Sequence, residues 1–319
     1  MSRPRPSRRG LVAAVVGAPW LAWAAVRGLG LDLGHPLVAA MAFTPYAAAS
    51  ALLPVVLALA LRAWVAAAVA TVVALALVWA VAPRATDGPH LAREGADGRR
   101  LVVMTCNVLF GRADARAVVR LARERHVDVL SLQELTPEFV DRLDAAGIRR
   151  LLAGRVLSPR PWAAGSGLMA RGALRRVTAR EAQPFAQPEA ELTLAGGVAL
   201  RLKAVHAPPP VSSAGATSWR TTLRDLPGPR AGTIPRLLLG DFNGTLDHRE
   251  IRRLLDRGFY DAADATGDGL RATWPLARSR PTIAIDHVLA PEPIRTRRLS
   301  VHDVPGSDHR AVIAELVLP

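Results

Sequence analysis

The sequence predicts an all-α membrane region followed by one α/β domain, and three observations support this division. Nearly all of the long apolar runs of the 319-residue chain fall within residues 11–82. From Leu101 onward, short apolar stretches of strand length alternate with amphipathic stretches of helical spacing. The segment 101–319 is also long enough to form one domain with a sizeable core.

Composition excludes several classes of protein. Half of the residues are hydrophobic and 21% are charged, which excludes a disordered chain. The single cysteine, Cys106, excludes a disulfide framework and a cysteine-rich zinc site. The formal net charge is +14 and Lys203 is the only lysine, so we attribute the arginine excess to GC-biased codon usage on a solvated surface. The same charge favours anionic partners such as phosphodiesters or lipid headgroups.

Three apolar runs predict three membrane-spanning helices, because a span needs about 20 apolar residues. The helices are expected over about 11–31, 37–61 and 63–82. The first reaches full length if Arg27 extends its guanidinium to the membrane interface. Arg8 and Arg9 before an apolar run also suit a signal peptide, so two helices behind a cleaved signal, or a helical hairpin, are the alternatives.

Arginines beside the spans predict the orientation of the chain. The densest basic cluster is in the N-terminal tail, at Arg3, Arg5, Arg8 and Arg9. It places the tail in the cytoplasm, and three crossings then place everything after Ala82 outside. A second set of arginines opposes this orientation: Arg84, Arg93, Arg99 and Arg100. We expect a multi-pass protein of the cell membrane with an extracytoplasmic domain, partnered by the lipid bilayer and by no other protein.

The composition also predicts domain boundaries. Residues 83–100 are rich in Gly, Pro, Asp and Arg and lack an apolar period, so they predict a linker. The membrane region therefore occupies 1–82 and the second domain 101–319.

The first elements of that domain alternate between strand and helix. Leu101–Cys106 is a continuous apolar run of strand length. Ala113–Arg125 places apolar side chains at helical spacing on one face. Val127–Leu132 predicts a second buried strand. Pro137–Ala145 predicts a helix, because proline is favourable in the first turn.

The same alternation continues toward the C-terminus. Apolar runs predict strands at Ala199–Val205, Arg236–Leu239, Ile283–Leu289 and Ala311–Leu318. Helices are expected at Thr217–Leu226 and Asp247–Asp256, with Asp247 as the N-cap of the second.

Polar side chains capable of chemistry recur at the ends of these apolar strands. They are Asn107, Glu134, His206, Asp241, Asn243, Asp286, Asp308 and His309. A single Asn after a strand is usually a turn residue, and a single His is usually a satisfied hydrogen-bonding group. Because strand ends converge on one rim of a sheet-based core, the set together predicts one functional site.

Five motifs carry a resemblance to a known family. They are Thr105-Cys106-Asn107-Val108, Gln133-Glu134, Gly240-Asp241-Phe242-Asn243, Ile285-Asp286-His287-Val288 and Ser307-Asp308-His309-Arg310. In this order they resemble the endonuclease/exonuclease/phosphatase superfamily, which includes pancreatic-type deoxyribonuclease, abasic-site endonucleases, neutral sphingomyelinases and inositol-polyphosphate 5-phosphatases. The resemblance covers roughly 101–319 and implies a four-layer sandwich, with two mixed sheets packed face to face and helices outside. His206 followed by Pro208-Pro209-Pro210 and Trp219 looks like the membrane-tethered bacterial branch.

The resemblance implies a hard divalent cation, Mg²⁺ or Mn²⁺, bound by oxygen ligands. Glu134 would supply a carboxylate and Asn107 an amide oxygen. Asp308 would lie near a second metal position or brace the site, and the sequence leaves both possibilities open.

The same resemblance implies the catalytic residues. His309 would act as general base or transition-state stabiliser, with Asp286 holding its second ring nitrogen. Asp241 would orient or deprotonate the attacking water, Asn243 would donate to a phosphate oxygen, and His206 would contact the phosphate. The sequence does not decide whether His309 or Asp241 takes the proton.

Three neighbouring residues receive other interpretations. Cys106 is expected in the core, because successive side chains of a strand point to opposite faces. His287 is expected to face away from the site for the same reason. Trp274 either packs in the core or contacts substrate.

The sequence thus predicts a membrane-anchored, divalent-metal-dependent phosphoester hydrolase. A phosphodiesterase or endonuclease is the leading expectation, since the positive charge favours nucleic acid. The alternative is a phospholipid, sphingomyelin-type or small-molecule phosphoesterase, which the membrane tether favours. A catalytically inactive binding module is disfavoured because every motif residue is present, and a transporter is disfavoured because the spans lack internal charge.

Overall fold

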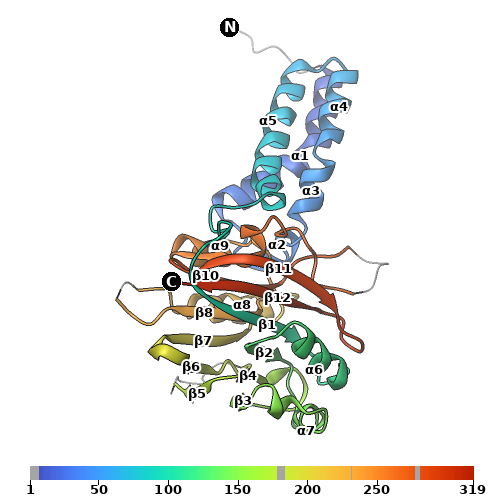
Figure 1. Cartoon of the computed structure of the whole chain (residues 1–319). Coiled ribbons are helices and arrows are strands. Elements are labelled where there is room, and N and C mark those ends of the chain that lie inside the picture. The colour runs from blue at the N-terminus through green and yellow to red at the C-terminus, as the bar shows by residue number, and fades with distance from the viewer. Residues whose placement is uncertain (1–6, 178–183, 231, 277–280) are drawn as a thin grey trace.

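The computed structural model describes residues 7–177, 184–230, 232–276 and 281–319. Two six-stranded sheets pack face to face and carry helices on their outer faces, and a bundle of helices stands on this sandwich (Figure 1). The predicted four-layer architecture is therefore confirmed. Arg3 and Arg5, on which part of the orientation prediction depends, lie outside the described residues.

The first sheet has the order β11-β12-β1-β2-β4-β3. Its strands are β1 (Arg99–Asn107), β2 (Val129–Gln133), β3 (Gly154–Ser158), β4 (Ser166–Ala170), β11 (Arg295–Asp303) and β12 (Arg310–Leu318). β1 and β2 are parallel, and every other neighbouring pair is antiparallel. Helices α6 (Ala115–Glu124) and α7 (Pro137–Ala145) pack on its outer face through a buried apolar cluster.

The second sheet repeats this plan in the order β5-β6-β7-β8-β10-β9. Its strands are β5 (Ala173–Arg176), β6 (Glu189–Thr193), β7 (Ala199–His206), β8 (Arg236–Asp241), β9 (Phe259–Asp261) and β10 (Asp286–Pro291). Only β7 and β8 are parallel. Helices α8 (Ser213–Arg224) and α9 (Arg249–Asp256) cover it around the buried Trp219, and the short α10 (Ala262–Ala265) follows β9.

The inner faces of both sheets form one apolar core. Alternate side chains of β1, β7, β8 and β12 meet there, as the period of two along a strand requires. A polar contact also crosses the core, where the buried Ser131 hydroxyl donates to the carbonyl of Leu239 at 3.0 Å. The core therefore holds the two sheets, and the rim at their ends, in a fixed relation.

The strands that the sequence did not predict are short or rich in charge. β6 alternates charged and apolar residues, and its Glu189 binds Arg236 at 3.1 Å. β11 carries three arginines in nine residues. Their apolar content falls below that of a buried strand, so pairing to neighbours within the sheet, rather than local composition, determines these elements.

The N-terminal helices are α1 (Arg8–Leu29), α2 (Leu37–Met41), α3 (Thr44–Ser50), α4 (Leu52–Ala60) and α5 (Trp64–Val81), followed by a 3₁₀ turn at Ala82–Ala85. Among the described residues, two helices are long and apolar enough to cross a membrane, Arg8–Leu29 and Trp64–Ala85.

The expectation of one helix over 37–61, the second of the three expected spans, is wrong in its extent. The run is divided, and its longest continuous apolar helix is Thr44–Ala60. Val38 is buried in the cluster of Trp219 and Leu254, so the start of the run packs on the sandwich. That packing removes Leu37–Met41 from the span.

The expected N-cap at Asp247 is also wrong. Helix α9 begins at Arg249, and Asp247 instead binds two arginines from the N-terminal region. The backbone N–H of Arg249 donates to Asp32, which lies in the α1–α2 connection. A residue of the N-terminal region thus satisfies a free N–H at the start of this helix.

Candidate active site at the strand ends

The eight residues predicted for the site come together at one rim of the sandwich. Asn107, His206 and Asp241 are the last residues of β1, β7 and β8, and Glu134 follows β2 directly. Because β10 and β12 run antiparallel to their neighbours, their starts reach the same rim, at Asp286 and just after His309. The topology therefore explains why residues from distant motifs converge.

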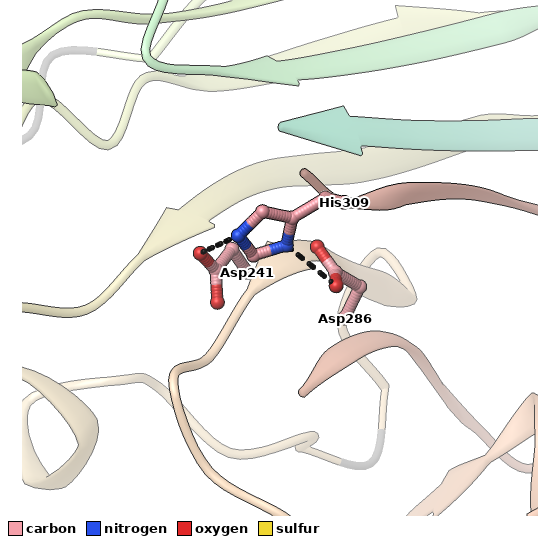
Figure 2. Close-up of side chains that lie close together, drawn as sticks. All are labelled: Asp241, Asp286 and His309. Atoms are coloured by element: carbon pink, nitrogen blue, oxygen red, sulfur yellow. Dashed lines mark hydrogen bonds and ion pairs between the residues drawn. The ribbon is translucent and has the colours of Figure 1, made fainter. Parts of the chain in front are cut away.

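His309 lies between carboxylates at the centre of this rim (Figure 2). Its Nδ1 is 2.9 Å from Asp286 Oδ2, and its Nε2 is 3.8 Å from Asp241 Oδ2 and 4.0 Å from Asp308 Oδ1. The bond to Asp286 fixes the ring so that Nε2 faces the other two carboxylates. This arrangement matches the role that the sequence predicted for Asp286.

Charge and burial act in opposite directions on this group. Burial alone would lower the pKa of His309, but the negative charges of Asp286 and Asp241 outweigh it and raise the pKa to about 10. Burial raises the pKa of Asp241, although the charge of His309 works against that rise. The imidazolium is therefore the favoured form of His309 at neutral pH.

Asn107 links the two sheets across the rim. Its Nδ2 donates to Glu134 Oε1 at 3.1 Å and to Asp241 Oδ2 at 3.0 Å, while its Oδ1 accepts from the N–H of Leu109. With the amide in this orientation its N–H groups, rather than the predicted ligand oxygen, face the carboxylates.

Glu134 is fixed by its backbone and by two hydrogen bonds. It has a left-handed φ of 59°, which is uncommon outside glycine, and its Oε2 accepts from the N–H of Phe110 at 2.7 Å. Burial raises its pKa, the hydrogen bonds oppose this, and the charge of Asp308 adds to the rise. The positive charge of His309 also opposes the rise, and it does so more strongly than Asp308 adds to it.

The turn after β8 places Asn243 beside Asp241. The N–H of Asn243 donates to Asp241 Oδ1 at 2.8 Å, and its Nδ2 donates to the carbonyl of Ala207. Its φ of 47° again lies in the left-handed region. One face of Asp241 is therefore occupied by this turn, and the other faces His309.

His206 completes the rim from β7. Its Nε2 is 3.9 Å from Asp241 Oδ2, and its ring packs against Phe185 at 4.5 Å between centroids. Burial and the charge of His309 lower its pKa to about 3, so it is neutral. Its Nδ1 is buried without a hydrogen-bond partner. Phe185 is a contact that the sequence did not predict, because no motif includes it.

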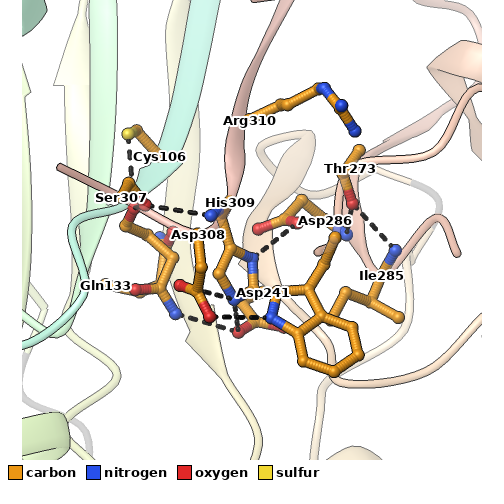
Figure 3. A network of polar contacts seen from close by, with 12 residues as sticks. Cys106, Gln133, Asp241, Thr273, Ile285, Asp286, Ser307, Asp308, His309 and Arg310 are labelled. Carbon is orange, nitrogen blue, oxygen red and sulfur yellow. Dashed lines mark hydrogen bonds and ion pairs between the residues drawn. The ribbon is translucent and has the colours of Figure 1, made fainter. Parts of the chain in front are cut away.

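A polar network supports His309 and Asp286 from behind (Figure 3). The Ser307 hydroxyl donates to the carbonyl of Asn107 and accepts from the N–H of His309. The Thr273 hydroxyl accepts from the N–H groups of Ile285 and Asp286. Both hydroxyls fix the backbone at the rim. The position of Ser307 within a motif, and of Thr273 beside Trp274, could have suggested this role.

Trp274 and the two other neighbouring residues also have defined places. Trp274 Nε1 donates to Asp308 Oδ2 at 2.9 Å, so this ring supports the site. Cys106 is buried in the apolar cluster under α6, and burial raises the pKa of its thiol. His287 faces away and binds Asp261 at 2.9 Å.

The donor set fits a hard divalent cation. The Oδ1 atom of the buried Asp286 and that of the partly exposed Asp308 are both buried and have no hydrogen-bond partner. Ligand atoms of Asp241, Asp286 and His309 also lie within 4.8 Å of one another. Oxygen donors with excess negative charge are the environment that Mg²⁺ and Mn²⁺ prefer.

Solved structures share this fold. A humanised D. rerio TDP2 has a TM-score of 0.52 and 18% identity, covering 68% of this chain and 98% of that one. An endonuclease/exonuclease/phosphatase family protein from Bacteroides thetaiotaomicron has a TM-score of 0.52 and 14% identity, with 70% and 100% covered. A mannosyl-6-phosphatase from the same species has a TM-score of 0.51 and 15% identity, with 68% and 100% covered.

Sequence comparison gives the family. No curated protein shows significant similarity to the chain. The model of the Endonuclease/Exonuclease/phosphatase family matches residues 104–309, which include all five motifs apart from Arg310. The chain belongs to the Endonuclease/Exonuclease/phosphatase family.

Proposed function

We propose that the protein is a membrane-anchored, divalent-metal-dependent phosphoester hydrolase that cleaves phosphodiesters by attack of water on phosphorus. The observation that carries the proposal is the imidazole of His309, bonded to Asp286 and facing Asp241 and Asp308. A protonated imidazole that is held in place beside carboxylates suits a reaction in which negative charge develops on phosphate oxygens.

Each residue has a chemical role in this proposal. Glu134 and Asp308 would hold Mg²⁺ or Mn²⁺, with Asn107 beside them, and the cation would neutralise charge on the phosphate oxygens. His309 donates from Nε2 to a phosphate oxygen, and Asp241 accepts the proton of the attacking water. His206 and Asn243 bind the phosphate through their ring and amide nitrogens.

We further propose that the protein crosses the membrane three times and that its catalytic domain is extracytoplasmic. Helices α1 and α5 run toward the sandwich and the α3–α4 unit runs back (Figure 1). Arg8, Arg9 and Arg62 then lie at the end far from the domain. Arg27 and Arg84, at the domain end, share the single carboxylate of Asp247, which offsets one of their two charges. The arginines at the far end favour a cytoplasmic N-terminus, against the opposing set of Arg93, Arg99 and Arg100.

Nucleic acid is the leading substrate class. The chain has a net charge of +14, and one structural neighbour, D. rerio TDP2, was solved with a single-strand DNA product. A phosphodiester backbone presents anionic groups of the kind that this basic chain attracts.

A phosphoester that carries an apolar chain is the second candidate, because the loops around the site expose apolar side chains. Five large apolar side chains are exposed in the described part of 101–319. Phe110, Trp162, Val211 and Leu270 lie on loops at the catalytic rim, and only Val198 lies at the opposite end. Exposed apolar clusters mark binding surfaces, and this one suits a lipid phosphate as substrate.

The test uses the full chain in detergent with bis(p-nitrophenyl) phosphate, supercoiled plasmid and phospholipid vesicles as separate substrates. We expect hydrolysis with Mg²⁺ or Mn²⁺ and none with EDTA. His309→Ala should lower kcat by about 10²- to 10⁴-fold, as expected for loss of an acid–base group. His302→Ala, which removes a histidine of β11 that bonds Ser300, should retain activity. Metal-independent turnover, or full activity in His309→Ala, would contradict the proposal.

A further inference from the structure

The N-terminal region contacts three loops of the catalytic rim, each close in sequence to a site residue. Arg27 and Arg84 bind Asp247, four residues after Asn243. The carbonyl of Arg84 accepts from the N–H of Gly269, four residues before Thr273. A flexible tether between an anchor and an enzyme would not require contacts of this kind.

The contact at Asp247 is a complete buried ion cluster. Its carboxylate is fully buried and accepts two bonds from Arg84, both 2.8 Å long, and one from Arg27 Nε at 2.6 Å. Burial alone would raise the pKa of Asp247, but the bonds and charges of Arg84 and Arg27 outweigh it and lower the pKa. Both arginines precede the catalytic domain in sequence, so the N-terminal region supplies all of the compensating charge in this cluster.

The third contact is at the strand that carries Asp286. The hydroxyl of Tyr46, on α3, donates to the carbonyl of Thr282 and accepts from its N–H, both at 2.9 Å. Thr282 lies four residues before Asp286, and the intervening Ile285 N–H is held by Thr273. One hydroxyl of the helical bundle thus fixes both polar backbone atoms of a residue next to the site.

We propose that the N-terminal helical region is a positioning element of the active site. Arg27, Arg84 and Tyr46 are positioning residues, because they hold the loops that present Asn243, Thr273 and Asp286 rather than contacting substrate. The inference rests on the proposed function for its catalytic readout. It goes beyond that function by making turnover depend on residues of the membrane anchor.

The sharpest test compares the two tyrosines of the chain. Tyr46→Phe removes the hydroxyl on Thr282, and Tyr260→Phe removes a hydroxyl that donates to the carbonyl of Ile294, away from the rim. With the full chain in detergent and bis(p-nitrophenyl) phosphate, Tyr46→Phe should lower kcat about three- to tenfold with KM unchanged, as loss of one positioning hydrogen bond predicts. Tyr260→Phe should leave kcat unchanged.

Hydrogen–deuterium exchange supplies a readout that does not require activity. In Tyr46→Phe, amides of 282–286 should exchange faster, while those of β3 should not change. Arg84→Lys, which keeps the charge but loses the paired bonds, should speed exchange over 241–248.

The outcomes separate the two proposals. Absence of turnover in the wild-type chain contradicts the proposed function, and exchange still tests the positioning role. Wild-type kcat together with unchanged exchange in both Tyr46→Phe and Arg84→Lys overturns the positioning role, even if their unfolding temperature falls.

Discussion

Two charge clusters lie at the same rim of the sandwich and differ in how completely they are paired. In the anchor cluster, two arginines surround Asp247, and both carboxylate oxygens are bonded. In the cluster at His309, one histidine stands among three carboxylates, and one oxygen each of Asp286 and Asp308 has no hydrogen-bond partner. The pKa of Asp247 is lowered, whereas burial raises that of Asp241.

The fully paired charges at Asp247 are the kind that stabilise a fold, whereas the incompletely paired charges at His309 are the kind found at sites of chemistry. A buried carboxylate that is fully bonded is a structural device, and breaking it is costly. Buried carboxylates with unpaired oxygens cost stability, and active sites are where such costs are retained. The comparison can be tested at each cluster by changing charge, metal and pH.

The largest expected effect is at the anchor cluster. Asp247→Ala should lower the free energy of unfolding by about 3–5 kcal/mol, because it leaves two buried guanidiniums unpaired. Asp303→Ala is the matched control: it breaks an exposed pair with Arg310 and should cost about 0–1 kcal/mol. Chemical unfolding of the full chain in detergent measures both. Equal costs would show that Asp247 is solvated in solution.

The second effect is at the cluster around His309 and depends on metal. Mg²⁺ or Mn²⁺ at about 100 times its Kd should stabilise the chain by about 2.7 kcal/mol, since it binds only the folded state. Thermal unfolding with and without metal measures this. Glu134→Gln should abolish the shift, and Glu124→Gln, on the exposed end of α6, should retain it. An unchanged shift in Glu134→Gln would place the cation elsewhere.

The third test is the pH response, in which the two clusters have opposite signs. The pKa of Asp247 is below its ordinary value of 3.8 in the folded chain, so its stabilisation is present above about pH 4 and is lost at lower pH. The pKa of His309 is raised from 6.5 to about 10, so its stabilisation is present below 6.5 and is lost as pH rises toward 10. Unfolding midpoints across pH should lose the acid-side decline in Asp247→Asn and the alkaline-side decline in His309→Gln. A profile that neither variant alters would contradict both assignments.

The sequence predicted that the residues around His309 would come together, because they lie at the ends or the starts of apolar strands. Asn107, His206 and Asp241 each end a strand, and a shared rim is the direct consequence of sheet geometry. The layered fold was predictable for the same reason, together with the family motifs. Strands such as β5 and β11 were not, since their arginines mask any apolar period.

The anchor cluster could not be predicted from local sequence. Asp247 precedes a helix and is of a residue type that often caps helices. Its partner Arg27, however, lies 220 positions away. Tyr46 lies in an apolar run that was assigned to the membrane, and nothing near it in sequence indicates Thr282. Long-range pairing of this kind is fixed by tertiary packing, which single-residue patterns do not encode.

In the proposed arrangement with three membrane crossings, the divided second run affects how the protein sits in a bilayer. Packing of α2 on the sandwich leaves Thr44–Ala60 as a 17-residue helix, about 25 Å long at 1.5 Å per residue. The hydrocarbon layer is about 30 Å thick, and a short span is accommodated by local thinning of the bilayer. Because the anchor is joined to the sandwich by buried bonds, this hydrophobic mismatch would draw the domain against the headgroups. The length of one helix would thereby set the height of the catalytic rim above the lipid.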